Sequence, residues 1–186
     1  MIVVIHAHPY PSRSRAGRAL VEAIRPLPDV EVRSLYDLYP DFDIDVAAEQ
    51  EALARAGLIV WLHPFYWYGV PGLLKHWFDK VLERGWAYGD GGVALAGKRC
   101  LWVPTVGGAE ETYAPGATNL KPFAHYVDPV EQTARFCRVV WEEPFVVFDA
   151  RAIQPDDLAR HAARLRERLL AYGGAPVRPV LEGAAA

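Results

Sequence analysis

The stretch that decides the fold lies before the middle of the chain and reads His63-Pro64-Phe65-Tyr66-Trp67-Tyr68-Gly69-Val70-Pro71-Gly72. An unbroken apolar run, residues 58–62, precedes it and is typical of a buried strand. After it, positions 73, 74, 77, 78, 81 and 82 are apolar, which predicts one face of a helix over residues 72–83. The stretch is therefore a loop between a strand and a helix, and it is unusually aromatic for a loop.

Aromatic side chains in a connection need a partner that hides them from water. One interpretation is a flat aromatic ligand stacked against residues 65–68. The other is burial against another part of the chain or against a second subunit, since large apolar surfaces are commonly hidden by association. The stretch alone leaves both interpretations open.

Composition narrows the class of protein. The 186 residues are 52% hydrophobic and 23% charged, which predicts one ordered domain, expected over residues 1–172, with a loose tail over 173–186. A net charge of -3 gives no reason to expect nucleic acid. The N-terminus enters apolar sequence directly and is interpreted as a strand, not a signal peptide, so the protein is expected to be cytoplasmic, with Cys100 and Cys137 as buried reduced thiols.

Strand and helix patterns alternate along the chain. Strands are expected over 2–6, 30–35, 58–62, 99–103 and 144–148, and helices over 16–24, 45–57, 72–83, 127–140 and 155–172, with Asp45 as a cap. This alternation predicts an α/β fold, a doubly wound five-stranded parallel sheet of order 2-1-3-4-5 with helices on both faces. In such a sheet the loops over 7–15, 63–72 and 104–120 meet at one edge.

The first of these loops has the features of an anion site. Ser12 and Ser14 precede a helix start, where free N–H groups and the helix dipole attract negative charge. His8, Arg13 and Arg15 add donors, which suits a phosphate monoester. The alternative is an ordinary serine cap with solvated arginines. No dinucleotide fingerprint or Walker loop is present, and no ligand cluster supports a metal site.

The third loop carries Gly107 and Gly108 at the end of a predicted strand. Paired glycines let the backbone approach a ligand closely, although for the pair alone a plain turn is the better explanation. A phosphate cradle, an aromatic wall and a glycine ledge at one edge together favour flavin mononucleotide (FMN), with its ring between the second and third loops.

Several segments match the sequence pattern of a known family: residues 7–11, 33–42, 47–53, 67–68, 85–89 and 107–108. On these it resembles the flavodoxin-like quinone reductase family and, more closely, the ancillary flavoproteins that activate glutathione-gated potassium-efflux antiporters. The resemblance covers roughly residues 1 to 150.

The resemblance implies bound FMN, NADH or NADPH as donor, quinones as acceptors in a ping-pong cycle, and a homodimer. It also implies a membrane antiporter as partner, which would place the protein peripherally at the inner membrane. Matching motifs assign the FMN phosphate to His8, Ser14, Arg15, Ala16 and Gly17, the ring wall to Phe65, Tyr66, Trp67 and Tyr68, and the polar edge of the ring to Thr105, Val106, Gly107 and Gly108.

Tyr113 matches the position of a family tyrosine that helps settle charge during hydride transfer. The family's best-known members place a histidine six residues further on, and this chain has Asn119 there. Backbone N–H groups of residues 106–108 would stabilise the same charge.

Two other functions stay open: a regulatory subunit in which catalysis is secondary, and a one-electron carrier of flavodoxin type. Such carriers are usually strongly acidic, whereas this chain has 23 acidic against 20 basic residues. Aromatic connections over 36–42 and 86–88 predict a homodimer with the active site near its interface.

Overall fold

The strands form one parallel sheet in the order β2-β1-β3-β4-β5, which confirms the predicted fold. The computed structural model describes residues 1–172, so the predicted tail lies outside the described residues. Every residue of β1 and β3 is buried, because helices cover both faces of the sheet. The strands are β1 (Ile2–His6), β2 (Val30–Ser34), β3 (Leu58–Pro64), β4 (Arg99–Thr105) and β5 (Val140–Trp141).

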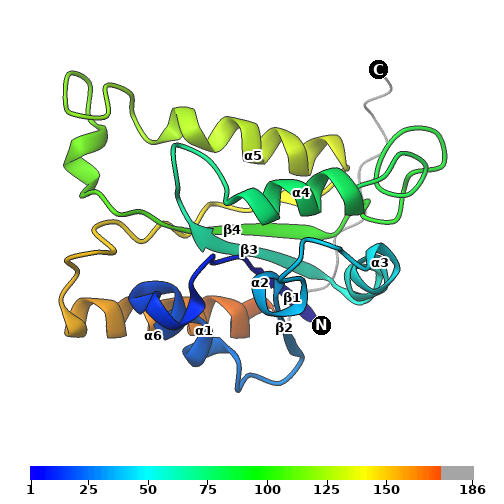
Figure 1. Cartoon of the computed structure of the whole chain (residues 1–186), viewed down its shortest axis with the longest axis horizontal. Coiled ribbons are helices and arrows are strands. Elements are labelled where there is room, and N and C mark those ends of the chain that lie inside the picture. The colour runs from blue at the N-terminus through cyan, green and yellow to red at the C-terminus, as the bar shows by residue number, and fades with distance from the viewer. Residues whose placement is uncertain (173–186) are drawn as a thin grey trace.

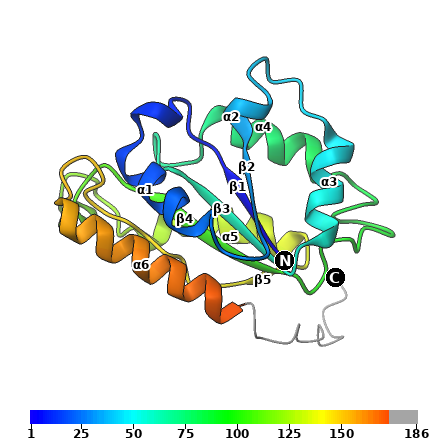
Figure 2. The same cartoon turned by 90° about the horizontal axis from the view of Figure 1, so that it is seen from below.

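The helices divide into two layers, visible in both ribbon views (Figures 1 and 2). On one face α1 and α6 bury apolar side chains, and on the other face α3, α4 and α5 do so. The helices are α1 (Arg15–Ile24), α2 (Leu35–Leu38), α3 (Val46–Arg55), α4 (Gly72–Val81), α5 (Ala124–Phe136) and α6 (Pro155–Tyr172), with short 3-10 turns η1 (Pro11–Arg13) and η2 (Glu110–Tyr113).

The last strand and the helix before it were predicted with wrong boundaries. The helix expected over 127–140 runs from Ala124 to Phe136, and the strand expected over 144–148 is formed instead by Val140–Trp141. Residues 144–148 still run beside β4, since the Val147 N–H donates to Pro104 O at 3.0 Å. Pro144 has no N–H to donate to a ladder, which explains why regular pairing stops before it.

The two cysteines lie where the sequence predicts. Cys100 and Cys137 are both buried and unpaired, and burial raises the pKa of each thiol. Within residues 1–172, no helix has the length and apolar character needed to span a bilayer.

A buried carboxylate ties the elements on one side of the sheet together. Asp45 caps α3 as predicted, accepting from the Ala48 N–H at 3.0 Å, and the same helix carries Glu49, which is fully buried. Glu49 Oε1 accepts from Arg33 on β2 at 2.6 and 2.8 Å and from the Tyr39 hydroxyl at 2.6 Å. Its other oxygen accepts from Trp77 Nε1 on α4 at 2.9 Å. One side chain thus joins β2, α3, α4 and the segment after α2.

We expect Glu49→Ala to lower the free energy of unfolding by about 3–5 kcal/mol, because it leaves the partly buried Arg33 guanidinium without its buried partner. Glu51→Ala on the same helix is the matched control: Glu51 is 76% exposed and pairs with Arg55, so its loss should cost under about 0.5 kcal/mol. Urea unfolding curves of the two variants measure the difference. Equal costs would show that Glu49 has no special role.

Candidate functional site

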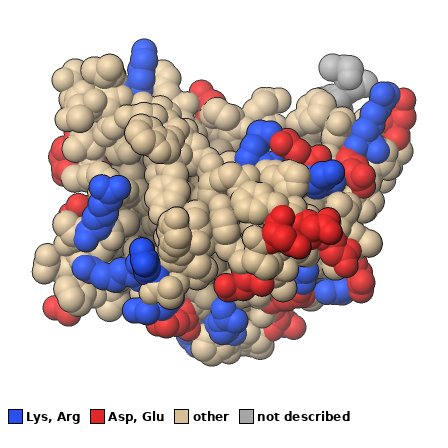
Figure 3. Space-filling model, in the orientation of Figure 1, with Lys and Arg blue, Asp and Glu red and all other residues tan. Residues whose placement is uncertain are grey.

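The three predicted loops leave the sheet from the same edge. Hydrogen bonds continue the ladder just past the strand ends: the Ala7 N–H donates to Leu62 O at 3.0 Å, and the Phe65 N–H donates to Thr105 O at 2.9 Å. The chain segments that follow β1, β3 and β4 are thereby held side by side at the carboxyl ends of the strands (Figure 1). In the space-filling view this part of the surface is mostly uncharged with basic side chains around it, whereas acidic side chains gather over α2 and α3 (Figure 3).

The loop after β1 presents free donors at the start of α1. The first helical bond runs from the Arg18 N–H to Ser14 O at 3.3 Å. No backbone bond of the described chain uses the N–H groups of Arg15, Ala16 or Gly17, which are the first three of the helix. Together with the helix dipole, these groups offer the donors that the predicted anion site requires, and we refer to the N–H groups of residues 15–17 as the cradle.

The Ser14 side chain does not occupy the helix N–H groups. Ser14 is buried but does not cap its own helix, which argues against the ordinary serine cap. A Cβ at Gly17 would lie 2.6 Å from Ser14 Oγ, so any larger residue would crowd the cradle.

His6, at the end of β1, was missed as a site residue by the sequence analysis. It is 4% exposed, its Nδ1 lies 3.2 Å from Ser34 Oγ, and its Nε2 is buried without a partner among the described residues. That atom lies 3.8 Å from the position a Cβ at Gly17 would take. A buried polar atom without a partner costs about 1–3 kcal/mol, so its place beside the cradle fits a phosphate group bound there.

His8 is a neutral donor on the same side. Its Nδ1 accepts from the Tyr10 N–H at 3.0 Å, which puts the ring proton on Nε2. Burial lowers the pKa of His8, and burial lowers the pKa of His6 to about 4, so both rings are uncharged at neutral pH. Arg13 and Arg15 are exposed at the rim, with the Arg13 guanidinium 5.7 Å from the centre of the Tyr10 ring.

The aromatic loop after β3 is a tight turn in a strained conformation. Tyr66 and Gly69 exchange both backbone hydrogen bonds, at 3.0 and 3.2 Å. Between them Trp67 and Tyr68 have φ angles of 49° and 62°, a left-handed pair that Asn-Gly normally supplies. Two larger residues in this conformation store strain, which is commonly a mark of a functional site. The turn leaves Trp67 95% exposed.

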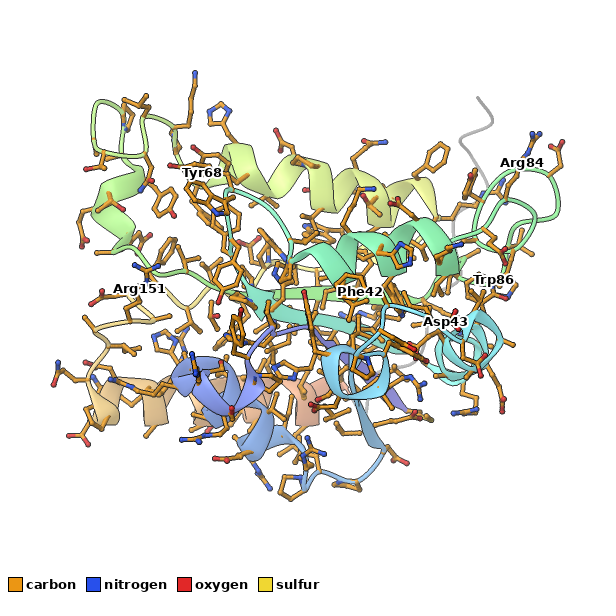
Figure 4. The ribbon with its side chains drawn as sticks, in the orientation of Figure 1. Phe42, Asp43, Tyr68, Arg84, Trp86 and Arg151 are labelled. Carbon is orange, nitrogen blue, oxygen red and sulfur yellow. The ribbon has the colours of Figure 1, made fainter. Side chains whose placement is uncertain are left out.

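The residues of this loop do not share one role. Phe65 is 8% exposed, and its ring packs 5.1 Å from Phe123 and 5.7 Å from Tyr126 in the core. Tyr68 stacks on Tyr126 at 5.2 Å, and Figure 4 shows it beside the start of α5. Burial within the chain therefore accounts for Phe65, while Tyr66, Trp67 and Tyr68 stay at the surface, where a ligand or a partner can cover them.

The loop after β4 offers fewer donors than the sequence predicts. The Val106 N–H is already used, donating to Val147 O at 2.8 Å, and Thr105 is buried with its carbonyl bonded to Phe65. The expectation that Val106 stabilises charge on a ligand is therefore wrong. The N–H groups of Gly107 and Gly108 have no backbone acceptor in the described chain and form the glycine ledge.

Tyr113 lies next to this ledge. A Cβ at Gly108 would be 3.6 Å from Tyr113 Cε2, and no hydrogen bond within residues 1–172 uses the Tyr113 hydroxyl. The side chain is 7% exposed among aromatic rings, and burial raises its pKa, so the hydroxyl keeps its proton. Asn119 does not pair with it: Asn119 donates to Thr112 Oγ1 at 2.8 Å and accepts from Tyr68 at 3.2 Å.

Arg151 completes this edge and was also missed, because it follows the fifth strand and not one of the three expected loops. Its Nε lies 3.1 Å from the position a Cβ at Gly107 would take. Figure 4 shows Arg151 toward the same end of the molecule as Tyr68, with Arg84 and Trp86 at the opposite end.

Comparison with known proteins agrees with this geometry. A protein-family profile described as a flavodoxin-like fold matches residues 1–169. The chain belongs to this family. It is 51% identical over 172 residues to the glutathione-regulated potassium-efflux system ancillary protein KefF of Salmonella typhi, covering 92% of this chain and 97% of that protein.

Two solved structures are similar over most of the chain. General stress protein 14 of Treponema denticola, in complex with FMN, has a TM-score of 0.85 and 34% identity, covering 91% of this chain and 98% of that one. An NADPH-quinone reductase from P. pentosaceus has a TM-score of 0.82 and 26% identity, covering 90% and 96%. The resemblance noted in the sequence is thereby confirmed.

We expect Gly17→Ala to weaken FMN binding by at least about tenfold, because a methyl group 2.6 Å from Ser14 Oγ would push the Ser14 hydroxyl out of its position beside the cradle. Gly72→Ala is the matched control, since Gly72 also lies in the first turn of a helix but has open space around its Cβ position. Fluorescence titration of the apoprotein with FMN measures both affinities. Equal affinities would place the phosphate elsewhere.

Proposed function

We propose that this chain is an FMN-dependent NAD(P)H:quinone oxidoreductase that works by a two-electron ping-pong cycle. The observation that carries the proposal is the start of α1, where three N–H groups without acceptors in the described chain lie near His6, whose buried Nε2 has no partner among the described residues. FMN-bound general stress protein 14, similar in fold and sequence, supports the choice of anion.

Different residues would bind different parts of the cofactor. Ser14 and the N–H groups of residues 15–17 would hold the phosphate, with His8 as a neutral donor. Trp67 and Tyr68 would wall the ring, and the glycine ledge would donate to its polar edge. FMN, when bound, supplies the ring that accepts and passes on hydride, whereas the chain supplies binding, orientation and electrostatics.

Donors at the ledge matter because negative charge collects at the polar edge of the ring when hydride arrives. Gly107 and Gly108 are fixed before the reaction, so their N–H groups need little reorganisation to stabilise that charge. The protonated Tyr113 hydroxyl, unused within the described chain, would add a third donor. Asn119 would act only by holding Tyr68, Thr112 and α5 in place.

The exposed aromatic rings of residues 66–68 would form an apolar slot for flat substrates. Nicotinamide and quinone would occupy this slot in turn, which is why a ping-pong cycle fits. The proposal includes both NADH and NADPH as electron donors. The similar NADPH-quinone reductase supports a quinone as acceptor.

A second role, as ancillary subunit of a potassium-efflux antiporter, is supported by the 51% identity to KefF. It would hold the protein in the cytoplasm at the inner membrane through its partner. The same proposal includes a homodimer, in which Leu38 (47% exposed) and Phe42 (43% exposed) would be covered. Trp86 and Tyr88 contribute less to that surface than their sequence suggests, because each already packs against the core of its own chain.

We expect the purified protein to be yellow and to release FMN, not FAD, on acid treatment followed by chromatography. NADH or NADPH should bleach the flavin absorbance under anaerobic conditions, and a quinone should restore it. If the protein binds FMN but neither nucleotide bleaches it, only the regulatory role remains. If the protein takes up no FMN, the site assignment is wrong.

We expect Tyr113→Phe to slow flavin reduction by between about 10-fold and about 10²-fold, because one donor to the developing charge is lost. FMN affinity should hold, since the phosphate is bound elsewhere. Tyr126→Phe is the control from the same aromatic cluster, because its hydroxyl is occupied by Asn119 O at 3.0 Å. Stopped-flow reduction by each nucleotide decides: equal rates in all three proteins would make Tyr113 structural.

A further inference from the structure

Arg151 lies across the glycine ledge, and nothing in the described chain engages its charge. Its Nε, Cδ and Cζ atoms are 3.1, 3.5 and 3.6 Å from the position a Cβ at Gly107 would take. No ion pair or hydrogen bond among residues 1–172 involves its guanidinium, and the side chain is exposed. Because Gly107 has no side chain, the Arg151 side chain can lie against the glycine ledge at the edge of the site.

The backbone fixes Arg151 there. The Asp149 N–H donates to Gly108 O at 2.9 Å and the Ala150 N–H donates to Val106 O at 2.8 Å, so the segment after residue 148 is bonded directly to the ledge. Asp149 has a φ of 53°, and its carbonyl accepts from the N–H of Ile153, which is buried. Backbone hydrogen bonds thus hold the turn on both sides of Arg151, so this residue does not lie on a free loop.

We propose that Arg151 is the positive charge that stabilises the reduced flavin at its polar edge, and so sets the reduction potential of the cofactor. The proposal rests on the proposed function, since it takes the ring to lie with that edge at the ledge. NAD(P)H would pass a hydride, two electrons and one proton, to flavin N5 and leave as NAD(P)⁺. The ring would then carry one extra negative charge at N1 and the C2 oxygen.

That charge is the reason a cation matters here. Gly107 and Gly108 supply only N–H dipoles, and Tyr113 a neutral hydroxyl, whereas the guanidinium is always charged. A quinone would later take the hydride equivalent and a proton from solvent to form the hydroquinone, which removes the charge again. Arg151 should therefore favour the reduced form over the oxidised form, with little effect on how tightly oxidised FMN binds.

The test is the two-electron midpoint potential of the FMN-loaded protein, measured by equilibration with a reference dye in the absence of NAD(P)H and quinone. Arg151→Met should weaken the binding of reduced relative to oxidised FMN about tenfold, which lowers the potential by about 30 mV. Arg151→Lys should retain most of the wild-type value. The shift should shrink at high salt, because the side chain is exposed.

Arg84→Met is the matched control, because it removes the same charge from an exposed arginine at the opposite end of the molecule (Figure 4). If Arg151→Met and Arg84→Met leave the potential equally unchanged, the proposal is overturned. An unchanged potential with slower reduction by NADPH but not by NADH would also overturn it and assign Arg151 to the nucleotide phosphate. A protein that binds FMN but is not reduced by either nucleotide contradicts the proposed function only, and one that binds no FMN overturns both.

Discussion

The site depends on the parallel ladder that joins β1, β3 and β4. Because its hydrogen bonds continue past the strand ends, at Ala7–Leu62 and Phe65–Thr105, three loops far apart in the sequence begin on three adjacent strands, each one strand spacing from the next. Their later conformations are local, but their starting points are set by the register. A slip in that register would separate the cradle from the ledge even if each loop kept its own structure.

The sequence was sufficient for the sheet order and the helix layers, because each follows from a short-range pattern. Continuous apolar runs give buried strands, and Asp45 gives a helix start that the structure confirms. The fate of Phe65 and Trp67 could not be predicted in this way. They are two residues apart in one aromatic run, yet a tight turn sends the first ring into the core and exposes the second.

Other features could not be predicted from the sequence because they depend on contacts between distant segments. The Val106 N–H is unavailable because it donates to Val147 O. A strand was expected over 144–148, but its pattern does not tell which N–H groups of the neighbouring segment it occupies. His6 is adjacent to the cradle only once α1 folds over the end of β1, and Arg151 approaches Gly107 only through the turn after Asp149. A single histidine or arginine in a sequence is not part of a repeating pattern, so such a contact cannot be predicted from it.

The polar groups around Glu49 and those at the carboxyl ends of the strands differ in whether the chain itself supplies their hydrogen-bond partners. Around Glu49 every oxygen is bonded, to Arg33, Tyr39 and Trp77, and the result is rigid structure.

At the carboxyl ends of the strands the same chain leaves the N–H groups of residues 15–17, 107 and 108 and the Tyr113 hydroxyl without partners among the described residues. The first N–H groups of a helix have no intrahelical acceptor, so together with the ledge they leave donors at this edge that a ligand can use. All of them donate. A ligand that accepts hydrogen bonds at both of its ends would suit this arrangement, as a phosphate on one side and the carbonyl edge of a ring on the other would do.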